Sequence, residues 1–266
     1  MERKPLSDRL LQSAAASRRF LDGDSLGRIA RFVRERQNRD GGFRGRDAKS
    51  DLYYTVFAVA CLKALGYPPP VFKIWKYALS FGMGKDLDLV HLVCLIRLRT
   101  VFPHFGSTRR RLLKGLQRFK ADSAYGLFLR LFAGDFRFAA PPASIAVSRS
   151  DPTTNLAAAL MVGHQEGIAE ELLARVCSAG GFAPSKQINV PDLLSTATAL
   201  FALTQRGVDL DDIHKPCFQY VESLWRDSGG FAGHVADEFE DVEYTFYALL
   251  SIGCLTQSMA KNYGNR

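Results

Sequence analysis

The chain has 266 residues, of which 47% are hydrophobic and 23% charged, and it carries a formal net charge of +8 at pH 7 with a sequence pI of about 9.3. These proportions are ordinary for a soluble globular protein with a buried core. Five cysteines, an odd number without CxxC spacing, argue against a disulfide framework and a thiolate zinc site, so a reducing, cytoplasmic location is expected. The charged first residues and an apolar run limited to 52–62 indicate neither a signal peptide nor a transmembrane segment, which needs about 20 apolar residues.

The first quarter of the chain predicts one short helix, then an outer helix and an inner helix. Residues 6–20 are expected to form a short helix that packs on the edge of the domain. Ser25 can cap a second helix whose apolar residues and arginines fall on different faces, so one side should be wet. The turn at 41–42 ends that helix, because glycine can take the positive φ of a C-cap. Asp51 then caps a helix that is apolar nearly all round through Leu62, and such a helix must be buried.

This unit of an outer and an inner helix recurs along the chain. Each copy has a Gly-Gly-Phe turn, a loop, an Asp-x-x-x-Thr helix start and an apolar run, and the three turns are 41–43, 180–182 and 229–231. Self-similarity at a period of a few tens of residues indicates a repeat architecture. The turns and loops should therefore join helical hairpins that stack side by side.

Counting along the chain gives six inner helices, expected from Asp51, from Asp86, at 123–132, at 151–162, at 192–203 and at 241–252. Outer helices are expected before most of them, at 71–80, 108–120, 168–177 and 215–226; residues 136–150 contain Pro141-Pro142 and little helical period, so the repeat near 123–151 should be degenerate. Inner helices that are apolar all round, without polar end repeats, favour a closed ring over an open solenoid. We therefore predict an all-α (α/α)6 toroid spanning 1–266 as one domain, with 1–24 as an N-terminal addition.

Basic residues gather in two places, which are Arg28, Arg31, Arg34, Arg36, Arg39, Arg44 and Arg46, and then Arg109, Arg110, Arg111, Lys114, Arg118 and Lys120. One interpretation is a surface for a polyanion, a phosphate-bearing ligand or an anionic membrane. The other is the solvated outer face of amphipathic helices. No nucleic-acid module with interleaved aromatic residues is present, so no nucleic-acid partner is expected.

The motif Gln-x-x-Asp-Gly-Gly-Phe at 37–43, with the later Gly-Gly-Phe turns and Asp-x-x-x-Thr starts, resembles the repeat shared by protein prenyltransferase β subunits and squalene-hopene and related terpene cyclases. The resemblance is strong at 26–66 and 168–254, and it implies a short, single-domain, bacterial-type member of that superfamily with the α/α toroid fold. It also implies that the turn residues Gln37, Asp40, Phe43, Phe182 and Phe231 are structural. One fold hosts several chemistries, so the activity depends on other residues.

The resemblance to protein prenyltransferases implies a catalytic zinc held by an Asp-x-Cys and a His at the starts of the last two inner helices. Here the first position reads Asp192-Leu193-Leu194 and the second Tyr244-Thr245, so only Asp192 matches. Zinc usually has at least three protein ligands. A zinc site is therefore not expected, whereas the acidic residues Asp237, Glu238, Glu240, Asp241 and Glu243 are compatible with Mg²⁺ or with a charged loop before a helix.

The resemblance to class II terpene cyclases implies an Asp-x-Asp-Asp acid. The match at 209–212 precedes an outer helix, where short acids cap helices. Asp86 and Asp88 precede an inner helix, and a carboxyl group that faces an apolar chamber would have a raised pKa and could donate a proton. The alternative is that these carboxylates cap the helix and occupy its first turn. His91 lies one turn after Asp88, which is compatible with an acid–base pair, a metal pair or a hydrogen-bonded core histidine.

Three functions remain open. The first is a prenyltransferase-like protein that transfers or processes an isoprenoid, or another apolar ligand with an anionic head, and that works alone or beside a partner subunit. The ligand would lie in an aromatic chamber lined by Tyr53, Tyr54, Phe57, Tyr125, Phe128, Tyr244, Phe246 and Tyr247. Arg97, an arginine among apolar residues, needs an anion, so it either pairs with a carboxylate or is the candidate for the head group. The second is a toroid that acts as a binding or scaffold protein without catalysis. The third is a cyclase with Asp88 or Asp86 as its acid.

Overall fold

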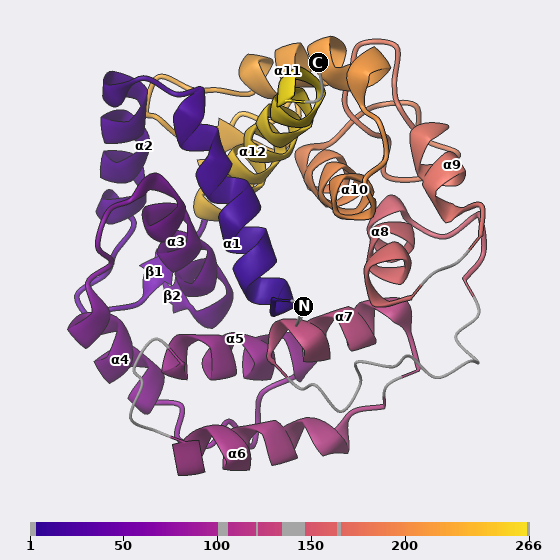
Figure 1. Ribbon diagram of the computed structural model, residues 1–266. Coiled ribbons are helices and arrows are strands. Elements are labelled where there is room, and N and C mark those ends of the chain that lie inside the picture. The colour runs from indigo at the N-terminus through magenta and orange to yellow at the C-terminus, as the bar shows by residue number, and fades with distance from the viewer. Residues whose placement is uncertain (1–3, 101–105, 121, 135–146, 164–165, 265–266) are drawn as a thin grey trace.

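The computed structural model describes residues 4–100, 106–120, 122–134, 147–163 and 166–264, and these form two concentric layers of helices (Figure 1). The inner layer consists of α3 (Leu52–Leu65), α5 (Leu89–Arg99), α7 (Ala124–Phe132), α8 (Thr153–Val162), α10 (Leu193–Arg206) and α12 (Val242–Gly264). The outer layer consists of α2 (Gly23–Glu35), α4 (Val71–Leu79), α6 (Gly106–Gly115), α9 (Ile168–Leu173) and α11 (Asp211–Ser223). Short 3-10 turns follow α1 (Leu6–Ala16) at Ser17–Arg19 and α6 at Leu116–Arg118.

The inner helices form a closed cycle. Each packs on the next in chain order from α3 to α12, and α12 packs on both α10 and α3. The expected all-α toroid is therefore confirmed, and the six expected inner helices are all present. The weak outer helix expected at 136–150 falls mostly outside the described residues and stays a prediction.

The repeat motif is held together by the same hydrogen bonds in each copy. In the first copy, Phe43 N donates to Thr55 Oγ1 at 2.9 Å, and that hydroxyl donates to the Asp51 carbonyl oxygen at 2.6 Å. Phe182 N donates to Thr196 Oγ1 at 2.9 Å and Phe231 N to Thr245 Oγ1 at 3.3 Å. The Asp-x-x-x-Thr start therefore satisfies the buried turn amide and anchors each inner helix to its turn.

Two of these loops also contain short antiparallel strand pairs. β1 (Phe43–Arg44) pairs with β2 (Ser50–Asp51), with Phe43 opposite Asp51. β3 (Phe231–Ala232) pairs with β4 (Glu240–Asp241), with Phe231 opposite Asp241. In the remaining copy, Phe182 and Asp192 form a single bridge. The pairings place the aspartate of each copy directly beside its phenylalanine at the start of the inner helix.

The position of α1 differs from the expectation that it packs on the edge of the domain. It lies across one end of the ring and packs against the inner helices α12 and α3 (Figure 1). A Cβ atom on Gly253 of α12 would overlap the Ser13 carbonyl oxygen of α1, so the two helices cross at backbone contact distance. The buried small residues Ser13 and Ala14 of α1, and Ser17 of the 3-10 turn that follows, permit this approach.

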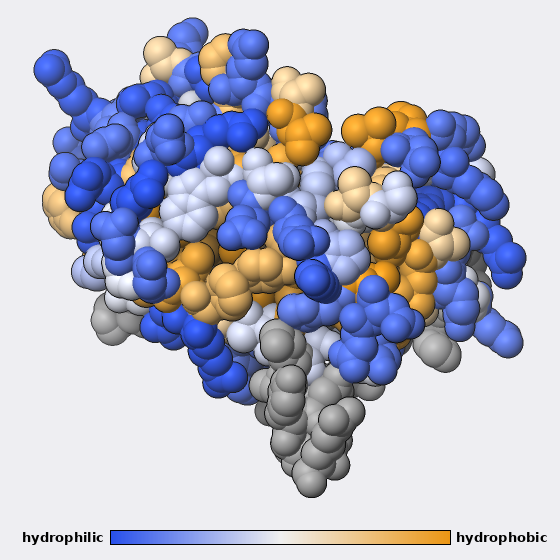
Figure 2. Space-filling view, turned by 90° about the horizontal axis from the view of Figure 1, so that it is seen from above, coloured by the Kyte–Doolittle hydropathy of each residue, from blue (hydrophilic) through white to orange (hydrophobic). Residues whose placement is uncertain are grey.

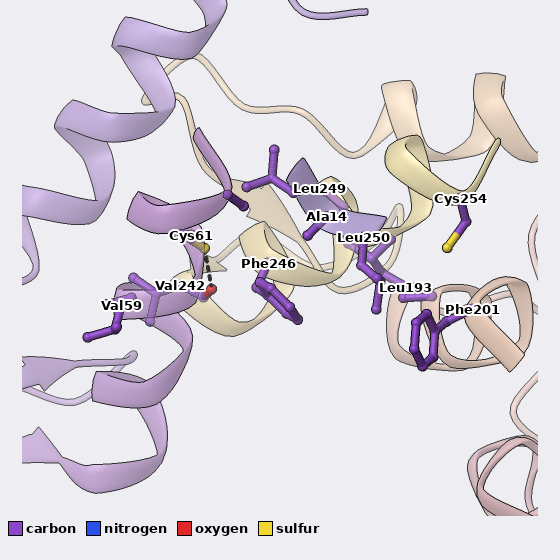
Figure 3. Close-up of a cluster of buried hydrophobic side chains, with 14 of the residues drawn as sticks. Ala14, Val59, Cys61, Leu193, Phe201, Val242, Phe246, Leu249, Leu250 and Cys254 are labelled. Carbon is purple, nitrogen blue, oxygen red and sulfur yellow. Dashed lines mark hydrogen bonds between the residues drawn. The ribbon is translucent and has the colours of Figure 1, made fainter. Parts of the chain in front are cut away.

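The core occupies the space between the inner and outer layers and the seam beneath α1. Figure 3 shows side chains of α1, α3, α10 and α12 converging, among them Ala14, Val59, Phe201 and Leu250, with the Cys61 thiol donating to the Val242 carbonyl oxygen at 3.5 Å. All five cysteines are buried and free. Figure 2 shows that the side seen from above is covered mainly by hydrophilic residues, with hydrophobic residues gathered in smaller patches.

Candidate functional site

The ring encloses a central cavity of about 580 Å³. Ligand-binding pockets range from about 300 to 1,000 Å³, so this one is large enough for a small-molecule ligand. All six inner helices and α1 contribute to its lining, which includes Leu10, Leu11, Val56, Phe57, Ala60, Val90, Val93, Cys94, Leu98, Phe128, Phe132, Asn155, Ala157, Ala158, Met161, Leu194, Thr198, Phe201, Phe246, Tyr247 and Leu250.

Aromatic rings form much of this lining. Phe57 lies at the centre of one group, with ring centroids 4.8 Å from Tyr53, 5.6 Å from Phe246 and 5.3 Å from Tyr247. These rings belong to the adjacent helices α3 and α12, and the closure of the ring brings them together. Aromatic faces bury large apolar areas and attract cations, so the lining suits an apolar chain and also a positive charge that develops on it.

One end of the cavity, the cation end, is defined by Lys63 in the last turn of α3 and Arg97 in the last turn of α5. Arg97 lies 5.0 Å from the centroid of Phe132, and no ion pair holds either cation among the described residues. Burial and the charge of Arg97 lower the pKa of Lys63, while Asp8 on α1 raises it. Burial also lowers the pKa of Arg97, and Asp8 raises it. The two cations thus repel one another and share one nearby carboxylate.

The opposite end, the tyrosine end, is defined by Tyr53, Tyr125 and Tyr247, which lie near the starts of α3, α7 and α12. Tyr53 donates a hydrogen bond from its hydroxyl group to Glu243 Oε1 at 2.6 Å. Burial raises the pKa of Glu243 to about 7, although the hydrogen bond from Tyr53 opposes the change. Glu243 is therefore a carboxyl group that exchanges its proton near neutral pH, directly behind a cavity-lining tyrosine.

The three predicted catalytic residues lie together but outside the cavity lining. Asp88, rather than Asp86, caps α5 by accepting from His91 N at 2.8 Å, and both aspartates are exposed. His91 Nδ1 lies 2.9 Å from both carboxylate oxygens of Asp88, and its Nε2 lies 3.3 Å from Asp51 Oδ2. Although the loss of solvent around it acts to raise the pKa of Asp88, the hydrogen bonds from His91 outweigh this and lower it, so Asp88 lacks the raised pKa expected of a buried acid.

Of the residues predicted to bind the ligand, the cavity brings together Arg97, Phe57 and Tyr247. Tyr54 and Tyr244 do not line it. Tyr54 packs against Gly45, and Arg46 lies 5.5 Å from the ring centroid of Tyr244. Both therefore pack around the loop that follows the first Gly-Gly-Phe turn. The other expected lining residues, Tyr53, Tyr125, Phe128 and Phe246, do face the cavity.

The acidic residues near the last two inner helices do not suit a metal ion. Asp192 accepts from Ser195 N at 2.7 Å and from Ser195 Oγ at 2.9 Å. Arg46 binds Asp237 at 2.5 Å and Asp241 at 3.1 Å. Within the part of the chain that the structure describes, no three His, Cys, Asp or Glu side chains come close enough to hold a metal ion. The donor set thus fits neither the zinc site that the resemblance to protein prenyltransferases implies nor a carboxylate Mg²⁺ site.

The acidic match at 209–212 lies away from the cavity. α11 begins at Asp211, and Asp209 Oδ1 accepts from Asp211 N at 3.0 Å. Asp211 and Asp212 occupy the first turn of this outer helix, where negative charge complements the helix dipole. Their role in the structure is therefore to begin α11.

The sequence profile of the prenyltransferase alpha-alpha toroid domain matches residues 11–116 and 153–263, more than half of the chain. The chain belongs to this family. The toroid also resembles a solved structure of a variant of MstE, a type II terpene cyclase from Scytonema, in complex with its substrate geranylgeranyl dihydroxybenzoate. That likeness has a TM-score of 0.56 at 15% sequence identity and covers 96% of this chain and 99% of the other, which establishes a shared fold. No curated protein matches the sequence.

The sequence interpretation of the toroid did not single out Lys63, Asp8 or the pair of Glu243 and Tyr53 as one site. In the sequence, Lys63 is simply the polar residue that ends an apolar run. Asp8 belongs to a helix that is expected to pack on the edge of the domain. Glu243 belongs to a cluster of five acidic residues in the sequence, and its link to the cavity is the hydrogen bond from Tyr53, which is distant in the sequence.

Proposed function

We propose that the toroid binds an isoprenoid chain with an anionic head group in its central cavity. The observation that carries this proposal is a cavity of about 580 Å³ with an aromatic lining and two cations, Lys63 and Arg97, at one end. The resemblance to a terpene cyclase that was solved with a geranylgeranyl-containing substrate supports the same ligand class. No described helix is long and apolar enough to cross a membrane.

The energetics favour such a ligand. Burying each CH₂-sized group contributes about 0.8 kcal/mol, so a chain of several isoprene units gains ample affinity from the apolar lining. Lys63 and Arg97 lie at helix C-termini, where positive charge is already favourable, and an anion between them would relieve their repulsion. A charge-assisted contact with Arg97 would fix the orientation of the ligand.

The two ends of the cavity set the direction of the bound chain. Tyr53 and Lys63 are ten positions apart on α3, which corresponds to about 15 Å along the axis at 1.5 Å per residue. With its head group at the cation end, the ligand extends toward the tyrosine end. The tail of the chain, and not its head, is therefore the part next to Tyr53 and Glu243.

Binding can be tested with geranylgeranyl diphosphate and with geranylgeraniol, which has the same chain and no anion. We expect thermal stabilisation of the toroid by both, and a lower Kd for the diphosphate, measured by isothermal titration calorimetry. Arg97→Met should weaken the diphosphate about tenfold or more and leave the alcohol nearly unchanged, because it removes the charge and keeps the apolar stem.

The matched control is Arg31→Met, which removes an exposed arginine from the outer helix α2. It should alter neither affinity. If neither ligand stabilises the wild-type toroid, the proposal is wrong and the interpretation as a scaffold without an isoprenoid ligand is favoured. If Arg31→Met and Arg97→Met weaken the diphosphate equally, the head group binds outside the cavity.

A further inference from the structure

The outer helix α4 presents apolar side chains to solvent. Ile74 is buried, whereas Val71, Phe72 and Leu79 of the same helix are exposed, Phe72 by 69% of its surface. Met83, in the turn that follows, is exposed as well. Outer helices usually turn polar residues outward, so exposed apolar residues gathered in one place mark an interaction surface. We propose that α4 docks the protein on an anionic lipid bilayer, independently of what the cavity binds.

The exposed side chains of α4 form one stripe. Phe72, Trp75 and Leu79 are three and four positions apart, which places them on the same face of the helix. The rings of Phe72 and Trp75 pack together, with their centroids 6.1 Å apart. A backbone contact fixes the orientation of α4, because a Cβ atom on Gly41 would lie 2.3 Å from the Lys73 carbonyl oxygen. The helix therefore cannot roll to bury this stripe without disrupting the first Gly-Gly-Phe turn.

The segment around the stripe carries positive charge only. Residues 67–85 contain Lys73, Lys76 and Lys85 but no aspartate or glutamate, and all three lysines are exposed. An apolar helix face with an aromatic residue, bordered by lysines, is typical of a helix that lies in a membrane interface. Lysine stems can cover apolar surface while their ammonium groups stay with the head groups. The stripe and its lysines thus match a surface that is apolar below and anionic above.

The outer helix α6 extends this positive region. Both α4 and α6 pack on α5, and they follow one another in the outer layer (Figure 1). Arg118, in the 3-10 turn after α6, donates to the Gly84 carbonyl oxygen at 2.8 Å and so joins α6 to the segment that follows α4. Arg110, Arg111 and Lys114 are exposed, and neither α6 nor its 3-10 turn contains an acidic residue. Since charges act over about 10 Å at ordinary salt, these cations add to the attraction of α4 for anionic lipids.

A second copy of the chain suits this face less well. A symmetric dimer through the stripe would bring Lys73 and Lys76 of both copies together, and lysine is depleted in protein interfaces. On a bilayer the same lysines contact anionic head groups, so their charge favours binding. The nine residues of α4 are too few to cross a hydrocarbon core of about 30 Å at 1.5 Å per residue. The helix therefore lies along the bilayer surface.

Binding of the full chain to vesicles tests the proposal. Liposomes of phosphatidylcholine, alone or mixed with phosphatidylglycerol, are sedimented with the protein and without any isoprenoid. We expect binding to the mixed vesicles that weakens with salt, and little binding to the neutral ones. Phe72→Ser should lower the partition coefficient at least about tenfold, because it removes a large apolar side chain from the contact. Lys73→Gln and Lys76→Gln should each lower it about fivefold.

Matched controls separate this face from general stickiness. Phe239 is exposed by 62% in the loop before α12, and Arg31 is exposed on α2. Phe239→Ser and Arg31→Gln should each change the partition coefficient less than about twofold, because neither residue belongs to the docking face. Thermal unfolding of each variant checks that the fold is kept. If Phe239→Ser lowers binding as much as Phe72→Ser does, or if no vesicle binds the wild type, the proposal is wrong.

Tryptophan fluorescence locates the contact. The chain has two tryptophans, so Trp225→Phe leaves Trp75 as the only one. Its emission should shift to shorter wavelength on the mixed vesicles, and a protein that binds without this shift docks through another face, which overturns the assignment. A dimer that Phe72→Ser dissociates, seen by light scattering in the absence of vesicle binding, would assign the stripe to a second copy instead. None of these outcomes bears on the ligand proposed for the cavity.

Discussion

Glu243 couples the stability of the protein to pH. Its pKa is about 7 in the folded state, against an ordinary value of 4.5, because burial disfavours the carboxylate. The folded protein therefore holds this proton more tightly than the unfolded chain does, and its free energy of unfolding falls as the pH rises from about 4.5 to about 7.

Glu243→Gln should remove this dependence, because glutamine keeps the shape and the hydrogen bond to Tyr53 without a charge. At about 1.4 kcal/mol per pKa unit, the variant should be more stable than the wild type at pH 8 by at most about 3 kcal/mol, and about equally stable at pH 4. Urea unfolding at the two pH values measures both differences. If the free energies of unfolding of the wild type and the variant change in parallel with pH, Glu243 has an ordinary pKa and this account is wrong.

Asp8 tunes the charge of the cation end. Its carboxylate raises the pKa of both Lys63 and Arg97, so it partly neutralises the site that we assign to an anionic head group. Asp8→Asn should therefore lower the Kd for geranylgeranyl diphosphate about twofold to fivefold, as befits one exposed charge. Calorimetry at low salt gives the measurement. Asp24→Asn, on the outer helix α2, removes the same charge far from the cavity and should have no effect; a rise in Kd for Asp8→Asn would contradict this account.

At the scale of single residues, the sequence could predict those side chains whose chemistry conflicts with their surroundings. Arg97 in an apolar helix is one, and it does line the cavity. Tyr54 and Tyr244 could not be separated from Tyr53 and Tyr247, because neighbouring positions of a helix that is apolar all round differ in direction by about 100° and the sequence pattern does not say which of them faces inward. The sequence could not decide whether Asp88 is a buried acid or a helix cap, because the exposure of the first helical turn depends on the preceding loop.

At the scale of elements, the threonine of the repeat motif links each turn to its inner helix. Thr196→Val would leave the buried amide of Phe182 without its acceptor. We expect a loss of about 1–3 kcal/mol in the free energy of unfolding, measured by urea denaturation. Thr256→Val in α12 is the control, since Thr256 only donates to the Ile252 carbonyl oxygen at 2.7 Å. It should cost much less, and equal losses would mean that the motif hydrogen bond contributes little.

The crossing of α1 and α12 depends on a residue without a side chain. In Gly253→Ala, the new methyl group would overlap the backbone of Ser13, and overpacking of this kind typically costs about 1–3 kcal/mol. Gly27→Ala is the matched control, because nothing lies within 4 Å of its Cβ position on α2. It should be neutral or stabilising by up to about 1 kcal/mol, as for glycine in a helix. Thermal unfolding compares the two, and a Gly253→Ala protein as stable as the wild type would contradict the close crossing.

The elements themselves were largely predictable from their caps and periodicity. Asp51, Ser123 and Asp192 cap α3, α7 and α10 as the sequence indicates. The placement of α1 was not, because its small residues read as a weakly apolar edge helix. These small residues become a packing surface only because Gly253, on a helix that is distant in the sequence, has no side chain at the crossing.

At the scale of the whole molecule, the ring closes where the last Gly-Gly turn meets the first outer helix. Gly229 has a φ of 94°, and a Cβ atom there would lie 2.7 Å from the backbone of Arg28. Arg28 also donates to the Asp227 carbonyl oxygen at 2.7 Å. Across the same seam, Arg46 from the first loop binds Asp237 and Asp241 of the last. Closure therefore depends on backbone contact and on ion pairs between the first and last repeats.

Gly229→Ala should separate the contribution of this contact from backbone strain. Gly207 also has a left-handed φ, of 73°, but nothing lies within 4 Å of its Cβ position. Alanine at Gly207 should cost about 1–2 kcal/mol from strain alone, and alanine at Gly229 should cost more. Equilibrium unfolding of both variants gives the difference. Equal costs would indicate that the seam adapts without loss.

The closed ring could be inferred from the sequence, since inner helices that are apolar all round need neighbours on every side. The hollow at its centre could not, because its volume depends on how far each side chain reaches inward. Alanines at Ala60, Ala157 and Ala158 leave space that larger residues would fill. The sequence shows that these side chains are small, but it does not show that all three face the same cavity.

The packing of α1 against α12 has a consequence for how the protein folds. The first described helix has its main packing partner in the last one, so the cavity is complete only after segments far apart in the sequence have come together. Contacts between such distant segments slow folding, because the intervening chain must be ordered before they form. Until these contacts form, the apolar inner helices stay uncovered. An isoprenoid that binds at this stage would be enclosed as the ring closes around it.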